Sequence, residues 1–219
     1  MESTRRLRPK LGSLLKAVSV AACTVVLAGV AFEALATYHY RSRGVPGKLV
    51  DVGGYRIHIY CEGTGSPTAV FDGGLGDPSD AYRDLRPKVA ITRTCVFDRP
   101  GLGWSDDGPL PRSSGQIAKE LHEALTKSGE KPPYILVGHS MSGYDVRIFA
   151  HEHPEEVAGM LLLDVSHPDQ NQRDSEFARH DRDEFMKRQV WWVRLAPFGI
   201  TRLLGHCDWR PQTADTATP

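Results

Sequence analysis

The sequence predicts an α/β fold in which helices cover both faces of a mostly parallel sheet. Short, uniformly apolar segments, of the kind that form buried strands, alternate along the chain with amphipathic segments of helical period. The alternation begins after two β-type runs separated by Gly53-Gly54, a dipeptide typical of a tight hairpin. An opening hairpin followed by alternating strands and helices is the arrangement of an α/β domain.

Six strands are expected in this arrangement. In the second, Ile57 and Ile59 alternate with polar residues, which suggests a strand with one covered face. The last two are short apolar runs that lie on either side of a helix. The expected strands span residues 48–52, 55–61, 68–71, 93–98, 134–137 and 160–163.

Three helices are expected between these strands. The first covers residues 79–90, with an end that Pro87 leaves open. The second begins at a capping box formed by Ser113 and Gln116 and stops at Gly129. The third covers residues 143–153, because a proline follows at position 154.

The composition fits a mid-sized globular domain and argues against nucleic-acid binding. The 219 residues are 40% hydrophobic and 25% charged, which is ordinary globular usage. Lys plus Arg and Asp plus Glu number 27 each, so no basic excess indicates a nucleic-acid partner. The four cysteines include no Cys-x-x-Cys pair and no cluster with histidine at zinc-ligand spacing, so we expect no metal site.

The N-terminus predicts a membrane-targeting helix. Residues 1–10 form a basic tail, and the stretch from 17 to 32 carries no charge. A bilayer core takes about 20 apolar residues in a helix, and the Lys16 side chain can reach the surface. We therefore expect residues 11–40 to be a single membrane anchor.

A cleaved signal peptide is the alternative interpretation of this segment. Ala34-Leu35-Ala36 has the A-x-A pattern that signal peptidase favours, and cleavage there would start the mature chain at Thr37. Because the positive end of such a helix stays inside, both interpretations place residues 41–219 on the periplasmic or extracellular side.

The rest of the chain divides by composition. Residues 41–47 are expected to be a linker, 48–166 the α/β core and 167–206 part of a helical lid. Residues 207–219 are polar and resemble neither lid nor strand. We interpret the chain as truncated, or as ending in an unrelated reading frame.

The segment from Tyr134 to Gly143 carries the chemistry. It reads as a strand, a tight turn and a helix start, with Ser140 at the turn. A serine held there in a strained conformation projects its hydroxyl above the sheet edge as a nucleophile. The residues two before and two after must be small, and they are Gly138 and Ser142, the latter in the place of the usual glycine.

Acyl transfer also requires donors aimed at a developing oxyanion. The backbone N–H of Met141, at the helix start, is one expected donor. The second is expected from the glycine-rich turn at 72–76, where either Gly74 or Leu75 would donate. His139, adjacent to Ser140, is interpreted as a packing residue under the turn and not as the catalytic base.

These motifs together resemble the α/β-hydrolase fold, and in particular the bacterial αβ-hydrolase-1 type of esterase-like proteins. The resemblance runs over about residues 48–205 and rests on GHSMSGY at 138–144, the glycine-rich turn and DRPGLGWSD at 98–106. LLLDVSHPDQ at 161–170 and APFGITRLLG at 196–205 are also similar to that group. The resemblance implies a sheet of eight strands in the order 1-2-4-3-5-6-7-8, of which this chain carries about six.

The resemblance also implies a triad in the order nucleophile, acid, histidine, with the histidine after the last strand. Asp164, at the end of the sixth strand, is a candidate acid or else an ordinary strand-end residue. No histidine occupies the place of the base, because His167 comes too early and His180 and His206 fall in the lid. Loss of a triad member generally lowers kcat by about 10⁴–10⁶.

If the resemblance holds for strand order, the second strand lies beside the fourth and antiparallel to it. Cys61 and Cys95 then come to the same end of the sheet, within the roughly 4.4–6.8 Å between Cα atoms that a disulfide requires. Two buried free thiols are the alternative.

Two function classes follow. One is a serine hydrolase, esterase-like, lipase-like or aminopeptidase-like, that acts on a small-molecule ester or amide through an acyl-enzyme and is inactive or incomplete as this chain stands. The other is a catalytically dead, membrane-anchored binding protein of the same fold. No cofactor is expected, because the mechanism needs only side chains and water.

Overall fold

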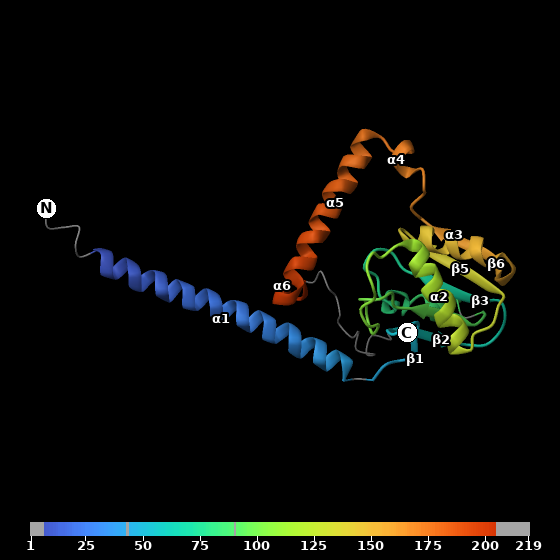
Figure 1. Ribbon diagram of the computed structural model, residues 1–219, viewed down its shortest axis with the longest axis horizontal. Coiled ribbons are helices and arrows are strands. Elements are labelled where there is room, and N and C mark those ends of the chain that lie inside the picture. The colour runs from blue at the N-terminus through green and yellow to red at the C-terminus, as the bar shows by residue number, and fades with distance from the viewer. Residues whose placement is uncertain (1–6, 43, 90, 205–219) are drawn as a thin grey trace, which may run out of the picture. The chain divides into compact units, whose positions relative to one another are not determined.

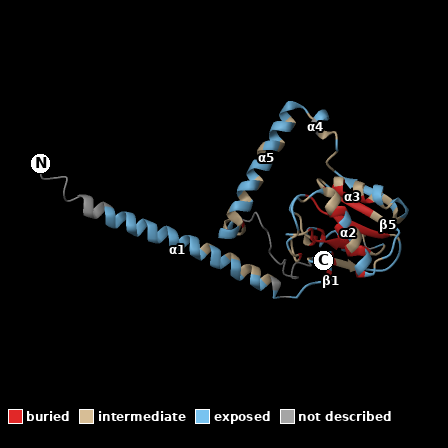
Figure 2. Cartoon of the chain, viewed as in Figure 1, coloured by how far each residue is buried: buried red, intermediate tan, exposed pale blue. Residues whose placement is uncertain are grey.

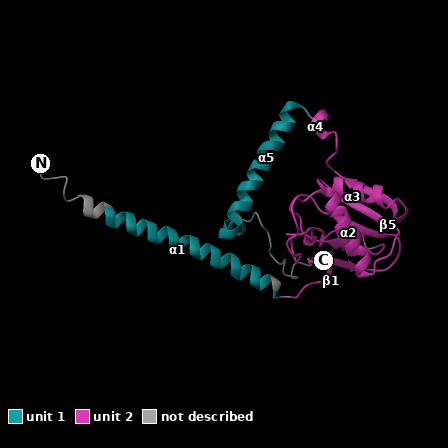
Figure 3. Cartoon of the chain, viewed as in Figure 1, with its two compact units in different colours: residues 1–43, 175–219 teal, residues 44–174 magenta. Residues whose placement is uncertain are grey.

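The computed structural model describes residues 7–42, 44–89 and 91–204. His206, Cys207 and the polar tail 207–219 lie outside the described residues, as do residues 1–6 of the basic tail. The chain forms two compact units, one of residues 44–174 and one of residues 1–43 with 175–219 (Figure 3). The domain boundaries proposed from composition remain predictions.

A six-stranded sheet forms the centre of the first unit (Figure 1). Its strand order is β1-β2-β4-β3-β5-β6, which is the order that the resemblance implies for these strands. The pairs β3–β4, β3–β5 and β5–β6 are parallel, and β1–β2 and β2–β4 are antiparallel. The strands are β1 (Lys48–Asp51), β2 (Arg56–Glu62), β3 (Thr68–Asp72), β4 (Thr94–Phe97), β5 (Tyr134–His139) and β6 (Val157–Leu163).

The opening hairpin is confirmed at the glycine pair. Gly53 and Gly54 have φ angles of 113° and 97°, a region open to glycine but strained for other residues. The Asp51 side chain accepts hydrogen bonds from both glycine N–H groups, at 2.9 and 3.1 Å. The turn therefore sets the register in which Asp51 pairs with Arg56.

Two α-helices, α2 (Ser114–Ser128) and α3 (Ser142–Glu152), pack together beside the sheet. Helix α2 begins and ends as predicted, because the Ser113 hydroxyl accepts from the Gln116 N–H and Gly129 closes the helix in the left-handed conformation. Figure 2 shows the buried residues gathered between these helices and the strands. That core contains Ile57, Ile59, Val70, Phe97, Leu121, Leu125, Leu136, Val146 and Phe149.

A second, smaller core contains Phe71, Tyr82 and Val137, with Val89 packed against it. The segment that contributes Tyr82 and Val89 forms two short 3₁₀ helices, η1 (Ser79–Tyr82) and η2 (Arg86–Val89). The single helix predicted over residues 79–90 is therefore wrong among the described residues. Pro87 explains this, since proline has no N–H to continue an α-helical ladder.

Strand β2 is covered more fully than its alternating pattern predicted. His58, expected on an open face, is 1% exposed. Its Nδ1 lies 2.7 Å from the Asp98 carboxylate, so a buried polar pair replaces the expected solvent contact. The prediction of one covered face was wrong for His58 because groups of Pro46, Ser79 and Asp98 contact its ring on the second face.

Cys61 and Cys95 are joined by a disulfide. They lie directly opposite each other in the antiparallel β2–β4 pair, with Cα atoms 4.1 Å apart. The separation is slightly below the expected range, and the disulfide interpretation is confirmed over the free-thiol one. Cys23 is a free, exposed cysteine in the described part of the chain.

The second unit is helical. Its N-terminal helix α1 (Leu7–Arg41) is long and apolar enough, over Gly12–Tyr40, to cross a membrane. The C-terminal part of this unit contains α5 (Glu176–Leu195), η4 (Ala196–Phe198) and α6 (Ile200–Leu203). Two short elements complete the first unit, namely η3 (Pro154–Glu156) before β6 and α4 (Gln170–Arg173) after it.

Candidate active site

The predicted site residues meet at one edge of the sheet, at the carboxyl ends of the parallel strands. Asp72 ends β3, Ser140 follows β5, and Asp164 follows β6. Asp72 pairs with Gly138, and the Leu163 carbonyl accepts the Ser140 N–H at 3.3 Å. Ligands of open α/β sheets bind at this edge, so the topology alone brings the three segments together.

Ser140 sits in a strained turn between β5 and α3. Its φ of 55° lies in the left-handed region, which is uncommon for a residue other than glycine. The turn requires small neighbours, because a Cβ on Gly138 would lie 2.9 Å from the Val146 side chain and 3.3 Å from the Ser142 Oγ. The backbone thus has the geometry that the strand–turn–helix pattern predicted.

Ser142 stands where glycine is usual, and its hydroxyl forms hydrogen bonds with the backbone around it. Oγ accepts the His139 N–H at 2.7 Å and lies 2.9 Å from the carbonyl oxygens of both Asp72 and His139, to which it can donate. The side chain is fully buried. Ser142 therefore connects the turn that carries Ser140 to the end of β3.

The glycine-rich turn lies against Ser140. A Cβ on Gly74 would be 3.3 Å from the Ser140 Cβ, so glycine is needed for this approach. The Gly74 N–H, however, already donates to the Asp77 carboxylate at 2.9 Å. Among the described residues the Leu75 N–H has no acceptor, and Met141 precedes α3 at the point where a helix leaves N–H groups unpaired.

Arg99, from the DRPGLGWSD motif, binds the backbone of this turn. Its guanidinium donates to the Gly73 carbonyl at 2.9 Å and to the Gly74 carbonyl. The same group lies 3.3 Å from the Asp72 carboxylate and 3.6 Å from that of Asp145. One buried arginine therefore connects the glycine-rich turn to strand β3 and helix α3.

The two carboxyl groups in this network are almost completely buried. Burial raises the pKa of Asp72 well above its ordinary value, against the opposing charge of Arg99, and the neighbouring Asp145 raises it further. Burial also raises the pKa of Asp145, while Ser114 and Arg99 favour its ionised form. Two carboxyls and one guanidinium are neutral together when one carboxyl keeps its proton.

Tyr82 completes the support of Asp72. Burial is the main cause that raises its pKa to about 12, so the hydroxyl stays protonated. It donates to the Asp72 carbonyl at 3.0 Å. The Asp72 carbonyl thus lies within hydrogen-bonding distance of two hydroxyls, those of Tyr82 and Ser142.

His139 differs from its predicted role as packing under the turn. Its side chain is 46% exposed, and Nδ1 lies 3.7 Å from the Asp77 carboxylate beside the glycine-rich turn. The prediction was wrong because side chains alternate along β5, and the strand ends here at the open edge of the sheet. Asp77, which sequence reasoning missed, contacts both His139 and the Gly74 N–H.

The structure brings no described histidine into hydrogen-bonding contact with Ser140. The His167 Nδ1 accepts the Asp169 N–H at 3.1 Å, and His180 lies in α5 of the other unit. Asp164 reaches the correct edge with an unusual φ of 45°, and its side chain is exposed. The predicted acid and the missing base therefore stay predictions.

Asp98 was also missed as an organising residue. Its carboxylate accepts the Trp104 N–H at 3.0 Å and the Ser79 N–H at 2.5 Å, and it pairs with His58. A Cβ on Gly103 would collide with this carboxylate. The available signal was an aspartate directly after a buried strand and before a glycine-rich loop.

Comparison with known proteins gives the same fold. A family model described as "alpha/beta hydrolase fold" matches residues 70–204. The chain is 36% identical over 127 residues to the protein YbdG of Bacillus subtilis, covering 57% of this chain and 39% of that one. It is 30% identical over 132 residues to an uncharacterised vacuolar membrane protein of Saccharomyces cerevisiae, covering 52% and 20%.

Among solved structures, a thermophilic esterase from Thermogutta terrifontis superposes with a TM-score of 0.53 at 23% identity, covering 73% of this chain and 55% of the esterase. The chain thus spans well under two thirds of the length of these relatives. The match at 70–204 nevertheless takes in both the glycine-rich turn and Ser140. By that match and by its strand order, the chain belongs to the α/β-hydrolase fold family.

Proposed function

We propose that this chain is the nucleophile-bearing part of a serine hydrolase that cleaves a carboxylic ester or amide through an acyl-enzyme. The observation that carries the proposal is the strained Ser140, with a φ of 55°, beside a glycine-rich turn that approaches its Cβ. A family match that covers both segments supports it.

In the proposed mechanism the Ser140 Oγ attacks the substrate carbonyl and forms the bond that becomes the acyl-enzyme. The Leu75 and Met141 N–H groups are the proposed donors to the oxyanion, because the Gly74 N–H is engaged by Asp77. The leaving alcohol or amine departs with a proton, and water then releases the acid. Arg99 and Ser142 hold the two turns in register and touch no reacting atom.

The proton on Ser140 requires an acceptor, which the family supplies as a histidine after the last strand. No described histidine contacts Ser140. This observation favours the second candidate function, a catalytically dead binding protein of the same fold. If the protein is a serine hydrolase, Asp164 is its proposed acid, since it lies at the same sheet edge as Ser140.

We also propose that α1 anchors the protein in a membrane, with residues 41–219 on the periplasmic or extracellular side. An apolar stretch over Gly12–Tyr40, basic residues before it and the Cys61–Cys95 disulfide support this orientation. Glu33, directly before the Ala34-Leu35-Ala36 pattern, lies inside a continuous helix and pairs with Arg202. That pairing favours the uncleaved anchor over the signal peptide.

A matched pair of chromogenic substrates tests the proposal. A p-nitrophenyl ester and a p-nitroanilide of the same acyl group are offered to this chain, to a form extended by the genomic sequence past codon 219, and to the Ser140→Ala variant of each. Hydrolysis by the extended form that requires Ser140 supports the enzyme, and the preferred substrate separates esterase from amidase. Substrate binding without Ser140-dependent turnover in either form favours the binding protein.

A further inference from the structure

Within the helical unit, the segment that follows α5 packs closely on the anchor helix. A Cβ on Gly29 of α1 would overlap the carbonyl oxygen of Phe198. A Cβ on Gly199, which has a φ of 70°, would lie 3.0 Å from the Gly29 carbonyl oxygen. The two backbones therefore touch at a pair of glycines, and a larger residue at position 29 would separate them.

An ion pair fixes this contact one helical turn further along α1. The Arg202 Nη2 and Nε lie 2.7 and 2.9 Å from the two Glu33 carboxylate oxygens, which is a two-pronged pair. Glu33 directly follows the uncharged stretch 17–32. A carboxylate at the end of an apolar span is costly unless it is paired, and Arg202 provides the partner.

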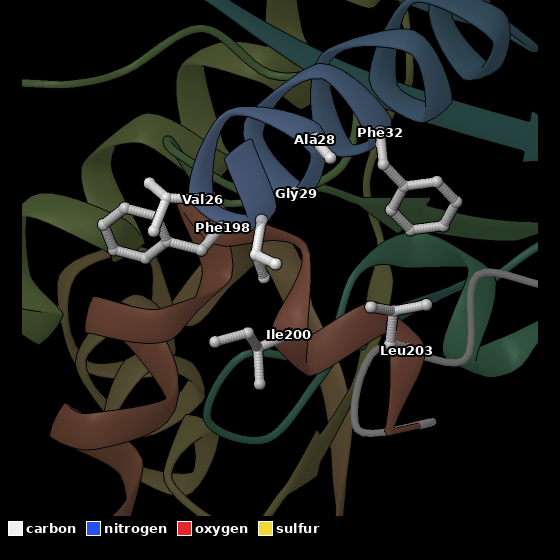
Figure 4. A pocket seen from close by; sticks show the side chains of 8 residues that line it. Val26, Ala28, Gly29, Phe32, Phe198, Ile200 and Leu203 are labelled. Atoms are coloured by element: carbon white, nitrogen blue, oxygen red, sulfur yellow. The ribbon is translucent and has the colours of Figure 1, made fainter. Parts of the chain in front are cut away.

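An apolar groove opens beside these two contacts. Figure 4 shows its lining side chains projecting from α1 and from the η4–α6 segment. The groove has a volume of about 580 Å³, within the range of small-molecule sites. Every side chain that lines it is apolar, and the principal ones are Val25, Val26, Phe32, Phe198, Ile200 and Leu203.

We propose that this groove binds an acyl chain of a bilayer lipid. Its lining offers no hydrogen-bonding side chain, so hydrocarbon is the complement of its walls. Its α1 wall, residues 25–32, lies inside Gly12–Tyr40, the stretch long and apolar enough to span a bilayer. The surrounding medium at that depth is therefore lipid chains, and Val26, Phe32 and Leu203 are all open to it.

The Glu33–Arg202 pair gives the site a polar end. It lies next to Phe32 in the sequence and at the boundary of the uncharged stretch, which is the level expected for headgroups. The site thus combines a hydrocarbon groove with a neutralised charge pair at one end. This inference rests on the part of the proposed function that places α1 in a membrane, and it is independent of catalysis by Ser140.

Photocrosslinking tests the site directly. The full chain is reconstituted in phosphatidylcholine vesicles that contain a phosphatidylcholine with a diazirine in one acyl chain, and adducts are mapped by mass spectrometry. We expect adducts concentrated on the groove residues of α1 and on 198–203. In Val26→Trp, which fills the groove, those adducts should be lost. In Leu27→Trp, a neighbouring exposed position that does not line the groove, they should persist.

Each outcome decides the matter. Adducts spread evenly around α1, unchanged in Val26→Trp, show ordinary annular lipid and overturn the proposal. Protein–protein adducts at the groove in place of lipid adducts show a second copy as occupant and also overturn it. Absence of adducts on the whole of α1 shows a helix outside the bilayer, which refutes the membrane proposal itself. The map of the unchanged protein remains decisive if Val26→Trp does not fold.

Discussion

The Ser142 hydroxyl lies 2.9 Å from the main-chain carbonyl of Asp72 and accepts the His139 N–H at 2.7 Å. These contacts connect the turn that carries Ser140 to the strand that leads into the glycine-rich turn. The connection exists because a serine stands at position 142, where the family pattern has a glycine two residues after Ser140. Ser142 therefore stabilises the relative position of the two turns.

Replacement of Ser142 by alanine removes this tie while it keeps the Cβ. The His139 N–H then loses its acceptor and the Asp72 carbonyl loses a donor, both in a buried site. We therefore expect the free energy of unfolding to fall by about 1–3 kcal/mol. Chemical denaturation in detergent measures it. Ser66→Ala, at an exposed loop serine, is the control and should change it by less than about 0.5 kcal/mol. Equal stability of Ser142→Ala and the unchanged protein would contradict the role assigned to the hydroxyl.

Reduction of the Cys61–Cys95 disulfide should destabilise the α/β unit, which is the compact unit of residues 44–174. The bridge closes a loop with a sequence separation of 34, which corresponds to about 3–4 kcal/mol of lost chain entropy in the unfolded state. The double variant Cys61→Ser/Cys95→Ser should show this loss and should no longer respond to dithiothreitol. Cys23→Ser serves as the control and should behave like the unchanged protein. Alkylation of Cys61 and Cys95 without prior reduction would show that no bridge forms.

Stability should also depend on pH through Asp72. Because burial raises its pKa, the native state holds this proton to higher pH than the unfolded chain does. The free energy of unfolding therefore decreases as pH rises through the interval between the ordinary and the raised pKa, by up to about 1.4 kcal/mol per pH unit. Asp72→Asn cannot ionise, so it should lose less stability between about pH 5 and about pH 8.

Denaturation curves at the two pH values give the comparison, with the exposed Asp107→Asn as the control for loss of a surface charge. Arg99 and Asp145 face the same carboxyl, so only the difference between variant and unchanged protein is assigned to Asp72. An identical pH dependence in Asp72→Asn would place the titration elsewhere.

Protease accessibility tests the proposed orientation. In spheroplasts of a Gram-negative host, added protease should degrade the α/β unit while α1 stays in the membrane fraction. Spheroplasts opened with detergent show that the protease is active in either case. Full protection in intact spheroplasts, or recovery of the chain in the soluble cytoplasmic fraction, would overturn the orientation.

Most of the fold could be predicted because turns, helix ends and buried strands depend on residues that are close together in the sequence. Gly53-Gly54 specified the hairpin, Ser113 and Gly129 bounded α2, and the apolar runs became the strands. The prediction of one helix over residues 79–90 failed because Pro87 interrupts the helix that the segment suggested. The prediction that His58 lies on an uncovered face failed for another reason. Its partner Asp98 is distant in sequence, so the local pattern gives no sign of the contact.

The site divides in the same way. The strained turn at Ser140 and the glycine-rich turn were visible as short motifs. The engagement of the Gly74 N–H by Asp77, and the exposure of His139, depend on how the two turns meet in space. Asp72 ends β3, Arg99 lies in the loop after β4 and Asp145 lies in α3, so no spacing in the sequence indicates that they form one buried network.

Covalent labelling of Ser140 tests the central claim most directly. A fluorophosphonate probe is offered to the extended form and to the present chain, and the modified residue is located by peptide mass spectrometry. We expect the adduct on Ser140 in the extended form and weak or no labelling of the present chain, because no described histidine contacts Ser140 to accept its proton. Ser140→Ala should abolish the label, and Ser42→Ala, at an exposed serine outside the α/β unit, should retain it. Equal labelling of Ser140→Ala, or an adduct on another residue, would contradict the assignment of Ser140 as the nucleophile.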